Sequence, residues 1–513
     1  MSWMEKYRDK ISTAENAVKK IKRGDYVFIG SGCASPQLLI EQMINYSDYL
    51  GDVKILHILT LGNAPYVEEK FTNVFRHNAF FIGANVREAI AKGRADYTPV
   101  HLSEIPLLLE KDLIHVDIAL IQVSPPDLHG FCSYGISVDI VKTAAEKAEF
   151  VIAEVNPRMP RTLGDSFIHV NDIDCLVESS NPLPEIPVNT PDEVAMKIAK
   201  NVATLVEDNS TIQLGFGRIP NAIASALREK HNLGVHTELF TDSIIELIES
   251  GVITGSQKNL HKGKVIASFC MGTQRLYELV NDNPLFEFHP AKYVNNPFII
   301  GENERMVAIN SALQIDLTGQ VCADSLGYEF FSGIGGHTDF IRGAARSIRG
   351  KPIIALPSTT QDGSSSRIVP HLDEGAGVAV TRADIHYVAT EFGIANLHGR
   401  SIRERAMALI SMAHPKFREM LLNEAKEHYY VYQDQVVLPA GGAIYPLELE
   451  TEYYTKDREK LFFRPVKADD EGLFQDFFYS LSDKTVYFRF FSHLKYMPHN
   501  FLQRFLNVDY YDR

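Results

Sequence analysis

One local pattern occurs twice in this chain and limits its possible folds more than any other feature. Residues 26–40 contain a β-type run that ends in Gly30-Ser31-Gly32, and a proline and an apolar helical pattern follow. Residues 211–229 repeat this order, with Gly215-Phe216-Gly217 at the turn and Pro220 before the helical run. Glycine-rich turns between a strand and a helix are common in α/β proteins, but two copies in the same order predict an internal duplication.

The other apolar runs predict the fold class. Strand-like runs at residues 53–58, 79–82, 118–123, 150–155 and 235–240 alternate with helical patterns. Short, continuously apolar strands that alternate with helices are typical of a parallel sheet covered on both faces. We therefore predict an α/β protein with two similar parallel-sheet α/β domains, plus an incomplete C-terminal α+β segment.

A proline-rich stretch at residues 181–187 has no periodicity and predicts a linker between the two domains. After the second domain, a strand pattern at 462–466 precedes helical patterns at 469–478 and 488–505, which together do not complete a domain-sized core. The predicted segments are a first domain at residues 1–185, a second domain at 186–435, and a linker with a truncated segment at 436–513.

Charge and cysteine usage exclude several classes of protein. The chain carries 51 Lys and Arg against 65 Asp and Glu, a formal net charge of −14, whereas a broad nucleic-acid-binding surface requires a basic face. No window approaches about 18 consecutive apolar residues, and the N-terminus lacks the apolar stretch of a signal peptide. The five cysteines lie far apart, which argues against disulfides and against a metal site. We expect a cytoplasmic protein that binds neither nucleic acid nor membrane.

Three positions are candidates for ligand binding or catalysis. The turn from Gly215 to Pro220 could present backbone N–H groups to a phosphate at a helix start, and the glycines at 333–336 could allow a close backbone approach. Glu238 lies near the end of a strand-like run, where ligands of open α/β sheets bind and where a carboxylate can act as nucleophile or base. Each has an ordinary alternative: a tight turn, a loop, and a surface glutamate, which by itself suits Glu238 better. A dinucleotide-binding dehydrogenase is a further alternative, although Pro220 interrupts the required glycine fingerprint.

Several ordered motifs resemble the acetyl-CoA hydrolase/transferase family of class I CoA-transferases, and most closely its 4-hydroxybutyrate and acetate CoA-transferases. The resemblance spans roughly residues 8–430, and its carriers lie at 124–130, 154–160, 215–220, 236–242, 332–340, 390–399 and 413–415. It implies that Glu238 is the covalent nucleophile, that Gly336 lies at the thioester and its oxyanion, and that Ser332 contacts CoA. The loop implied to bind CoA comprises Gly215, Phe216, Gly217, Arg218 and Ile219. The sequence from about residue 462 resembles the opening of a GNAT-type acetyltransferase domain.

The resemblance implies an acyl-CoA:carboxylate CoA-transferase. Such an enzyme moves CoA between a short-chain acyl-CoA and a free acid, here expected to be acetate, through a glutamyl-CoA thioester. CoA and acyl-CoA would be substrates, no tightly bound cofactor or metal is expected, and the expected oligomer is a homodimer. Two alternatives remain: an acyl-CoA hydrolase that uses the same glutamate, and a non-catalytic acyl-CoA-binding regulatory module.

Overall fold

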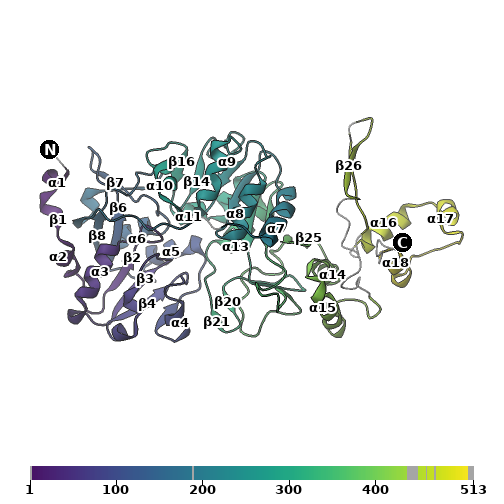
Figure 1. The fold of residues 1–513 in the computed structure, drawn as a ribbon, viewed down its shortest axis with the longest axis horizontal. Coiled ribbons are helices and arrows are strands. Elements are labelled where there is room, and N and C mark those ends of the chain that lie inside the picture. Colours follow the sequence, from purple (N-terminus) through teal and green to yellow (C-terminus); the bar gives the residue numbers. More distant parts are fainter. Residues whose placement is uncertain (1–2, 188–189, 436–448, 458, 467–469, 507–513) are drawn as a thin grey trace.

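The first half of the chain forms an eight-stranded sheet in which every pair of neighbouring strands is parallel (Figure 1). The computed structural model describes residues 3–187, 190–435, 449–457, 459–466 and 470–506. In spatial order, the strands are β1 (Ile11–Ser12), β10 (Cys175–Glu178), β8 (Phe150–Val155), β6 (Ile118–Val123), β2 (Tyr26–Ile29), β3 (Val53–His57), β4 (Phe75–Ala79) and β5 (Ala95–Tyr97). The α-helices of this half are α1 (Trp3–Lys6), α2 (Ala14–Val18), α3 (Gln37–Asn45), α4 (Arg87–Ala91), α5 (Ile105–Glu110) and α6 (Val141–Lys147). A small antiparallel pair, β7 (Phe131–Ser133) and β9 (Phe167–His169), lies outside the sheet.

The second half forms another eight-stranded sheet, which is parallel except for its last strand. In spatial order, its strands are β16 (Phe286–Phe288), β14 (Val265–Ala267), β12 (Gly234–His236), β11 (Thr211–Leu214), β17 (Met306–Ser311), β22 (Lys351–Ala355), β24 (Tyr387–Thr390) and β25 (Gly393–Asn396). The α-helices are α7 (Glu193–Leu205), α8 (Arg218–Ala226), α9 (Ile245–Glu249), α10 (Gln274–Val280), α11 (Ala291–Val294), α12 (Pro297–Glu302), α13 (His337–Arg346), α14 (Ile402–Met412) and α15 (Pro415–Glu427). Short strands outside the sheet are β13 (Leu239–Phe240), β15 (Phe269–Cys270), β18 (Gln314–Asp316), β19 (Val321–Cys322), β20 (Ser325–Leu326), β21 (Glu329–Phe330) and β23 (Ile368–Val369).

The two sheets share the same order over six of their eight strands. In each, the strand before the glycine turn is central, the next three sheet strands in the chain extend to one side, and the following strands extend to the other. The order β8-β6-β2-β3-β4-β5 in the first sheet therefore corresponds to β22-β17-β11-β12-β14-β16 in the second. This confirms the parallel-sheet α/β class. The domain boundaries at 185/186 and 435/436 stay a prediction, and residues 436–448 lie outside the described residues.

Several predicted elements differ from the observed ones; for example, residues 491–498 within the helical pattern predicted at 488–505 are not helical. The run at 79–82 is not a strand, because β4 ends at Ala79 and its polar residues, Arg76 to Asn78, hide the strand pattern. Helix α8 begins at Arg218 rather than after Pro220, since proline is tolerated in a first helical turn, where its missing N–H has no partner to lose. The predicted strand at 235–240 is divided between β12 and β13, which belong to different sheets.

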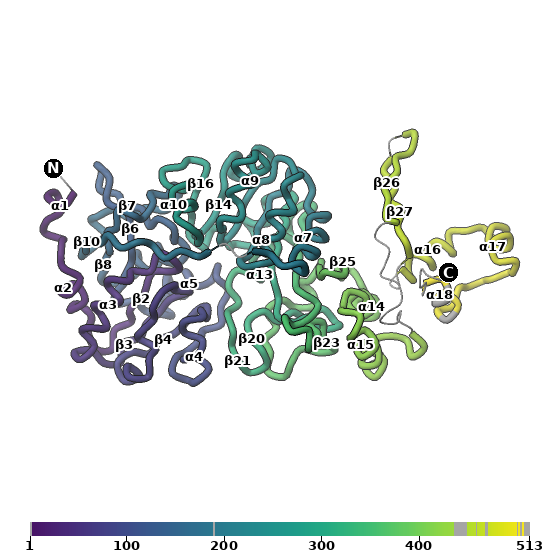
Figure 2. Tube along the Cα trace, in the orientation of Figure 1, coloured from purple at the N-terminus to yellow at the C-terminus, as the bar shows by residue number. Residues whose placement is uncertain are grey.

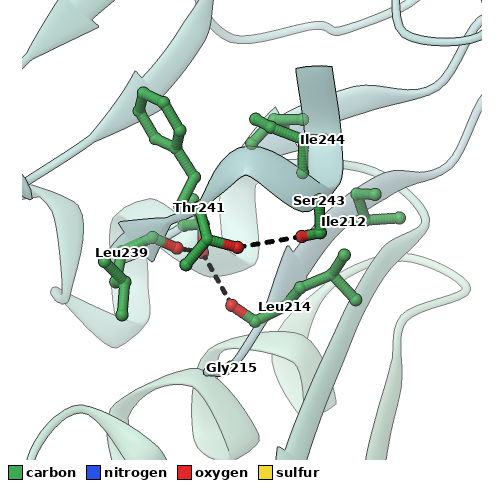
Figure 3. Close-up of a pocket in the computed structure, with 10 residues that line it drawn as sticks. Ile212, Leu214, Gly215, Leu239, Thr241, Ser243 and Ile244 are labelled. Atoms are coloured by element: carbon green, nitrogen blue, oxygen red, sulfur yellow. Dashed lines mark hydrogen bonds between the residues drawn. The ribbon is translucent and has the colours of Figure 1, made fainter. Parts of the chain in front are cut away.

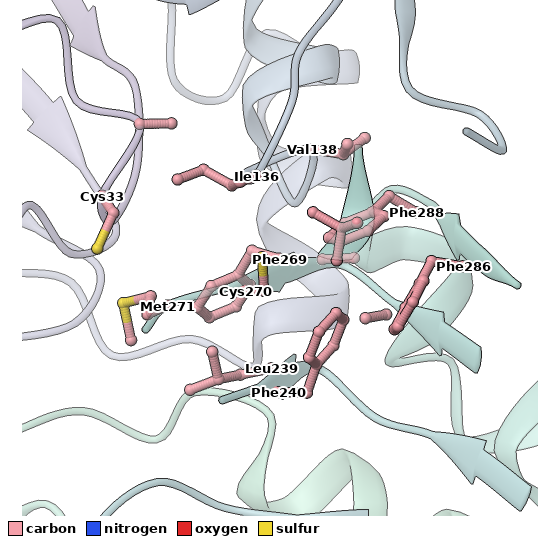
Figure 4. Packing of buried hydrophobic residues seen from close by; sticks show 14 of the residues in the cluster. Cys33, Ile136, Val138, Leu239, Phe240, Phe269, Cys270, Met271, Phe286 and Phe288 are labelled. Carbon is pink, nitrogen blue, oxygen red and sulfur yellow. The ribbon is translucent and has the colours of Figure 1, made fainter. Parts of the chain in front are cut away.

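An apolar core joins the two halves (Figure 4). Its members include Ile136 and Val138 from the first half and Phe240 and Cys270 from the second. Backbone hydrogen bonds reinforce the contact: the Cys270 N–H donates to the Ile136 carbonyl at 2.9 Å, and the Val138 N–H donates to the Ser268 carbonyl at 3.0 Å. All five cysteines are buried and unpaired. The relative placement of the two sheets is therefore set by continuous packing rather than by the linker.

The C-terminal segment packs mainly on itself (Figure 2). Its elements are the antiparallel hairpin β26 (Thr451–Tyr454) and β27 (Lys460–Phe463), followed by α16 (Glu471–Ser480), α17 (Asp483–Phe490) and α18 (His499–Leu506). Its buried cluster comprises Phe478, Val486, Met497, Leu502 and Leu506. Among the described residues, no helix has the length and apolar character needed to cross a membrane.

We expect deletion of residues 460–513 to leave the rest of the protein folded, because its buried cluster shares no residue with the other cores. The thermal midpoint of the main unfolding transition should change by less than about 2 °C, corresponding to less than about 1 kcal/mol. A deletion that starts at residue 415 is the control, since it removes Leu421 and Leu422 from a body core and should destabilise the protein strongly. Equal destabilisation by both deletions would show that the segment supports the body.

Candidate active site

A cavity of about 390 Å³ lies where the carboxyl ends of strands from both sheets meet. In the second sheet, β11, β12 and β17 end at it, at the point where the chain changes direction across the sheet. Open α/β sheets bind ligands at this topological switch point. Residues from the first half complete the wall. The wall includes Ile58, Leu59, Phe81, Leu102, Gly215, Phe216, Glu238, Ser332 and Gly336.

Glu238 occupies the interruption between β12 and β13. The Thr237 hydroxyl donates to the Leu239 carbonyl at 2.9 Å, so a local side-chain bond bends the backbone around the glutamate. The Glu238 carbonyl accepts the N–H groups of Ser268 and Phe269 at 2.9 and 3.1 Å. These hydrogen bonds fix the backbone around Glu238, which does not continue β12, and the Glu238 side chain lines the cavity.

A second, much smaller pocket of about 10 Å³ lies beside this bend (Figure 3). It is lined by Leu214, Leu239 and Ile244 among others, and the hydroxyls of Thr241 and Ser243 form a hydrogen bond of 3.0 Å there. Its volume is about that of a single water molecule, so it cannot accept part of an organic substrate. It is a packing void behind the site.

Two amide donors bind the Glu238 carboxylate. The Asn295 side chain donates from Nδ2 to Oε2 at 2.7 Å, and the backbone N–H of Gly336 donates to the same carboxyl group. A Cβ at Gly336 would lie 1.8 Å from Glu238 Oε2 and 2.1 Å from Asn295 Nδ2. Gly336 has φ of −88°, so close approach, and not left-handed backbone, requires glycine here.

The protein environment raises the pKa of Glu238 from an ordinary 4.5 to about 7. Burial is the main cause, and the nearby carboxyl groups of Asp339 and Asp139 act in the same direction, while the donors Asn295 and Gly336 oppose them. Burial also raises the pKa of Asp339 to about 7 and that of Asp139 to about 6. A carboxylate that titrates near neutral pH in a cavity is typical of a catalytic group.

The loop at residues 332–336 is held by the first half of the chain. The Ser332 carbonyl accepts the Ile82 N–H at 3.3 Å, and the Gly335 carbonyl accepts the Leu102 N–H at 3.0 Å. Phe81 packs so closely that a Cβ at Gly333 would lie 3.0 Å from its atoms. The Gly336 donor on Glu238 is thus positioned by residues more than 230 positions away in sequence.

The turn at residues 215–219 is only partly exposed to the cavity. Gly215 and Phe216 line it, while Gly217, with φ of +115°, forms the N-cap of α8. A residue with a side chain would be strained in this conformation. Arg218 forms an ion pair of 2.8 Å with Asp192, and Ile219 packs against the core. The Ser332 hydroxyl donates to the Ala323 carbonyl at 2.9 Å.

The structure therefore gathers Gly215, Phe216, Glu238, Ser332 and Gly336 around one cavity, and places Gly217, Arg218 and Ile219 just outside its wall. Sequence reasoning missed Asn295, which follows the short helix α11, and the two acids that raise the pKa of Glu238. It also did not identify which residues of the first half form the wall. No local signal distinguishes these residues from ordinary core and turn residues.

Two family models match this chain. The acetyl-CoA hydrolase/transferase N-terminal domain matches residues 1–188, and the acetyl-CoA hydrolase/transferase C-terminal domain matches residues 272–425.

Individual relatives are similar over most of the chain. The 4-hydroxybutyrate coenzyme A transferase of Clostridium kluyveri is 49% identical over 430 residues, which cover 84% of this chain and 100% of the relative. The succinyl-CoA:acetate/propanoyl-CoA:succinate CoA transferase of Fasciola hepatica is 46% identical and covers 78% of this chain and 84% of the relative. The crystal structure of a 4-hydroxybutyrate CoA-transferase from Porphyromonas gingivalis superposes with a TM-score of 0.72 at 37% identity, over 83% of this chain and 100% of that one.

We expect Glu238→Gln to become more stabilising as the pH rises. Because the folded-state pKa of Glu238 is raised, the folded protein binds a proton more tightly than the unfolded chain, so wild-type stability falls as the pH rises from 4.5 through about 7. The difference between these values corresponds to at most ~3 kcal/mol at 1.36 kcal/mol per pH unit. Urea unfolding at pH 5 and pH 8 measures the effect. The exposed Glu419 provides the control Glu419→Gln, and equal pH dependence in both variants would contradict the raised pKa.

Proposed function

The chain belongs to the acetyl-CoA hydrolase/transferase family, and from this membership we propose that it is an acyl-CoA:carboxylate CoA-transferase with Glu238 as its nucleophile. Relatives at 36–49% identity carry the names of CoA-transferases. The observation that carries the assignment of the nucleophile is the Glu238 carboxylate in the cavity, with two N–H donors on it and a pKa raised to about 7.

Such a carboxylate can transfer CoA without water. Glu238 attacks the carbonyl carbon of the acyl-CoA, the C–S bond breaks, and CoA leaves as its thiolate, which gives an acyl-glutamyl anhydride. The thiolate then attacks the Glu238 carbonyl carbon of the anhydride, the anhydride C–O bond breaks, and the first acid leaves as a carboxylate. The acceptor acid reverses both steps on the resulting glutamyl-CoA thioester, so no net proton transfer is required.

Asn295 and Gly336 fit the charge that develops in these steps. Attack on the Glu238 carbonyl places negative charge on a glutamyl oxygen, and the Asn295 amide already binds Oε2 at 2.7 Å. The Gly336 N–H is a second donor on the same group. Because the protein positions both donors before the reaction, each can stabilise the oxyanion by roughly 3–4 kcal/mol.

The cavity walls suit a short acid with an uncharged chain. Ile58, Leu59, Phe81 and Leu102 are apolar. The carboxyl groups of Asp139 and Asp339, which already raise the pKa of Glu238, would repel a second carboxylate on the substrate. Acetate, implied by the resemblance, fits this chemistry. Apolar walls also exclude water from the anhydride, which favours transfer over hydrolysis.

Gly215, Phe216, Gly217, Arg218, Ile219 and Ser332 are the proposed CoA-binding residues. The N–H groups at the start of α8 provide an anion-binding position for phosphate. Arg218 would contact a phosphate after exchanging its exposed partner Asp192, which costs little because exposed ion pairs contribute about 0–1 kcal/mol. A homodimer, the division into two domains at 185/186, and a GNAT-like character of the C-terminal segment belong to the same proposal.

We expect Glu238 to accumulate a covalent adduct when the protein is incubated with acetyl-CoA or butyryl-CoA and no acceptor acid, because the transfer route passes through a glutamyl thioester. Borohydride or hydroxylamine should trap it, and mass spectrometry should place it on the peptide that contains residues 236–242. Glu238→Gln should abolish the adduct. Glu238→Asp should reduce transfer on the order of 10²-fold, since it withdraws the carboxylate by about 1 Å.

Wild-type transfer by Glu238→Gln without an adduct would refute the covalent route. An adduct that releases CoA at the same rate with and without added acetate would instead identify a hydrolase. Binding of acyl-CoA with neither adduct nor turnover would identify a regulatory module.

We expect Gly336→Ala to lower turnover by at least about 10²-fold, because its Cβ would displace Glu238 or Asn295. Gly363→Ala is the control at an exposed loop where nothing lies within 4 Å of the new Cβ, although its φ of +68° adds some strain. Kinetics and thermal unfolding should be compared for both variants. If Gly336→Ala loses folding stability but retains normal turnover per folded molecule, the glycine has a structural role only.

A further inference from the structure

We propose that His261, Glu287 and His289 form a binding site for a divalent transition-metal ion of the zinc class. The three side chains come from the loop before β14 and from β16 and the residue after it, at one edge of the second sheet. One ligand atom from each lies within 4.8 Å of the others. Two imidazole nitrogens with one carboxylate oxygen form a common protein donor set for Zn²⁺.

The separations, which also allow hydrogen bonds, are close to those between two ligands of one ion. His261 Nδ1 lies 3.2 Å from Glu287 Oε2, and His289 Nε2 lies 3.5 Å from the same oxygen. A charge-assisted hydrogen bond would be shorter, at about 2.7–2.9 Å. Two ligands with bonds of 2.0–2.2 Å to a tetrahedral ion lie about 3.3–3.6 Å apart.

The surroundings orient the ligands as metal sites require. The Tyr293 hydroxyl hydrogen-bonds His261 Nε2 at 2.6 Å, which turns the other nitrogen toward Glu287. The side chains are 16–23% exposed, which leaves access for an ion and for a water as fourth ligand. Lys264 faces the other carboxylate oxygen at 3.6 Å and leaves Oε2 available.

Two hydrogen bonds connect this site to Glu238. The Ser268 hydroxyl donates to the His289 carbonyl at 3.0 Å, and the Ser268 N–H donates to the Glu238 carbonyl at 2.9 Å. A bound ion would tie the loop before β14 to β16 and stiffen the strand end that holds the nucleophile. Its role would be structural, because no ligand lines the cavity.

The test is metal binding by the full chain after treatment with a chelator. We expect one Zn²⁺ per chain in a titration against a chromophoric competitor, and Co²⁺ should give the intense visible bands of a tetrahedral ion with histidine ligands. Glu287→Gln and His289→Asn should each weaken binding at least about 10-fold. His115→Asn is the matched control, because it alters another cluster, His115 with Asp117 and Glu149, which is more exposed.

Octahedral Co²⁺ spectra, or equal weakening by His115→Asn, would overturn the proposal. So would a failure of the wild-type chain to bind Zn²⁺, a result that needs no variant and leaves the CoA-transfer assignment untouched.

Discussion

The structure depends on one constraint, namely that a carboxylate must remain reactive inside a largely apolar cavity. Burial disfavours the charged form of Glu238, and two N–H donors restore part of the lost solvation. The balance places its pKa at about 7, so a large fraction of the carboxylate is ionised at neutral pH. Removing one donor would raise the pKa of Glu238 further, whereas full exposure to water would lower it.

Both halves of the chain contribute residues that surround or position the Glu238 carboxylate. The second sheet contributes Glu238 at the end of β12 and Asn295 after α11, while the loop with Gly336 precedes α13. The first half holds that loop through Ile82, Leu102 and Ser103, the last of which binds Asp339 at 2.9 Å. The site is thus a property of the interface, not of either sheet.

Local sequence patterns predicted the regular elements well. The runs at 118–123 and 150–155 coincide with β6 and β8, because continuously apolar residues in a buried parallel strand leave a clear signal. The pattern failed at β4, where the three consecutive polar residues Arg76 to Asn78 interrupt the apolar run, and at Glu238, where a bend divides one apolar run between two sheets. A hydrophobicity pattern reports burial, but it does not report which sheet a strand joins. The bend itself depends on Thr237 and on the distant Ser268.

The sequence alone determined the parallel α/β class, the two glycine turns and, through its ordered motifs, the family and the candidate glutamate. These properties are local or are written in short motifs, so backbone preference and periodicity reveal them. Only the tertiary structure decided which donors reach Glu238, how far its pKa rises, and which first-half residues line the cavity. It also brought His261 to Glu287 and His289 through the pairing of β14 with β16. Hydrogen bonds, desolvation and ligand geometry depend on distances of a few ångströms between residues tens to hundreds of positions apart, and no local pattern encodes such distances.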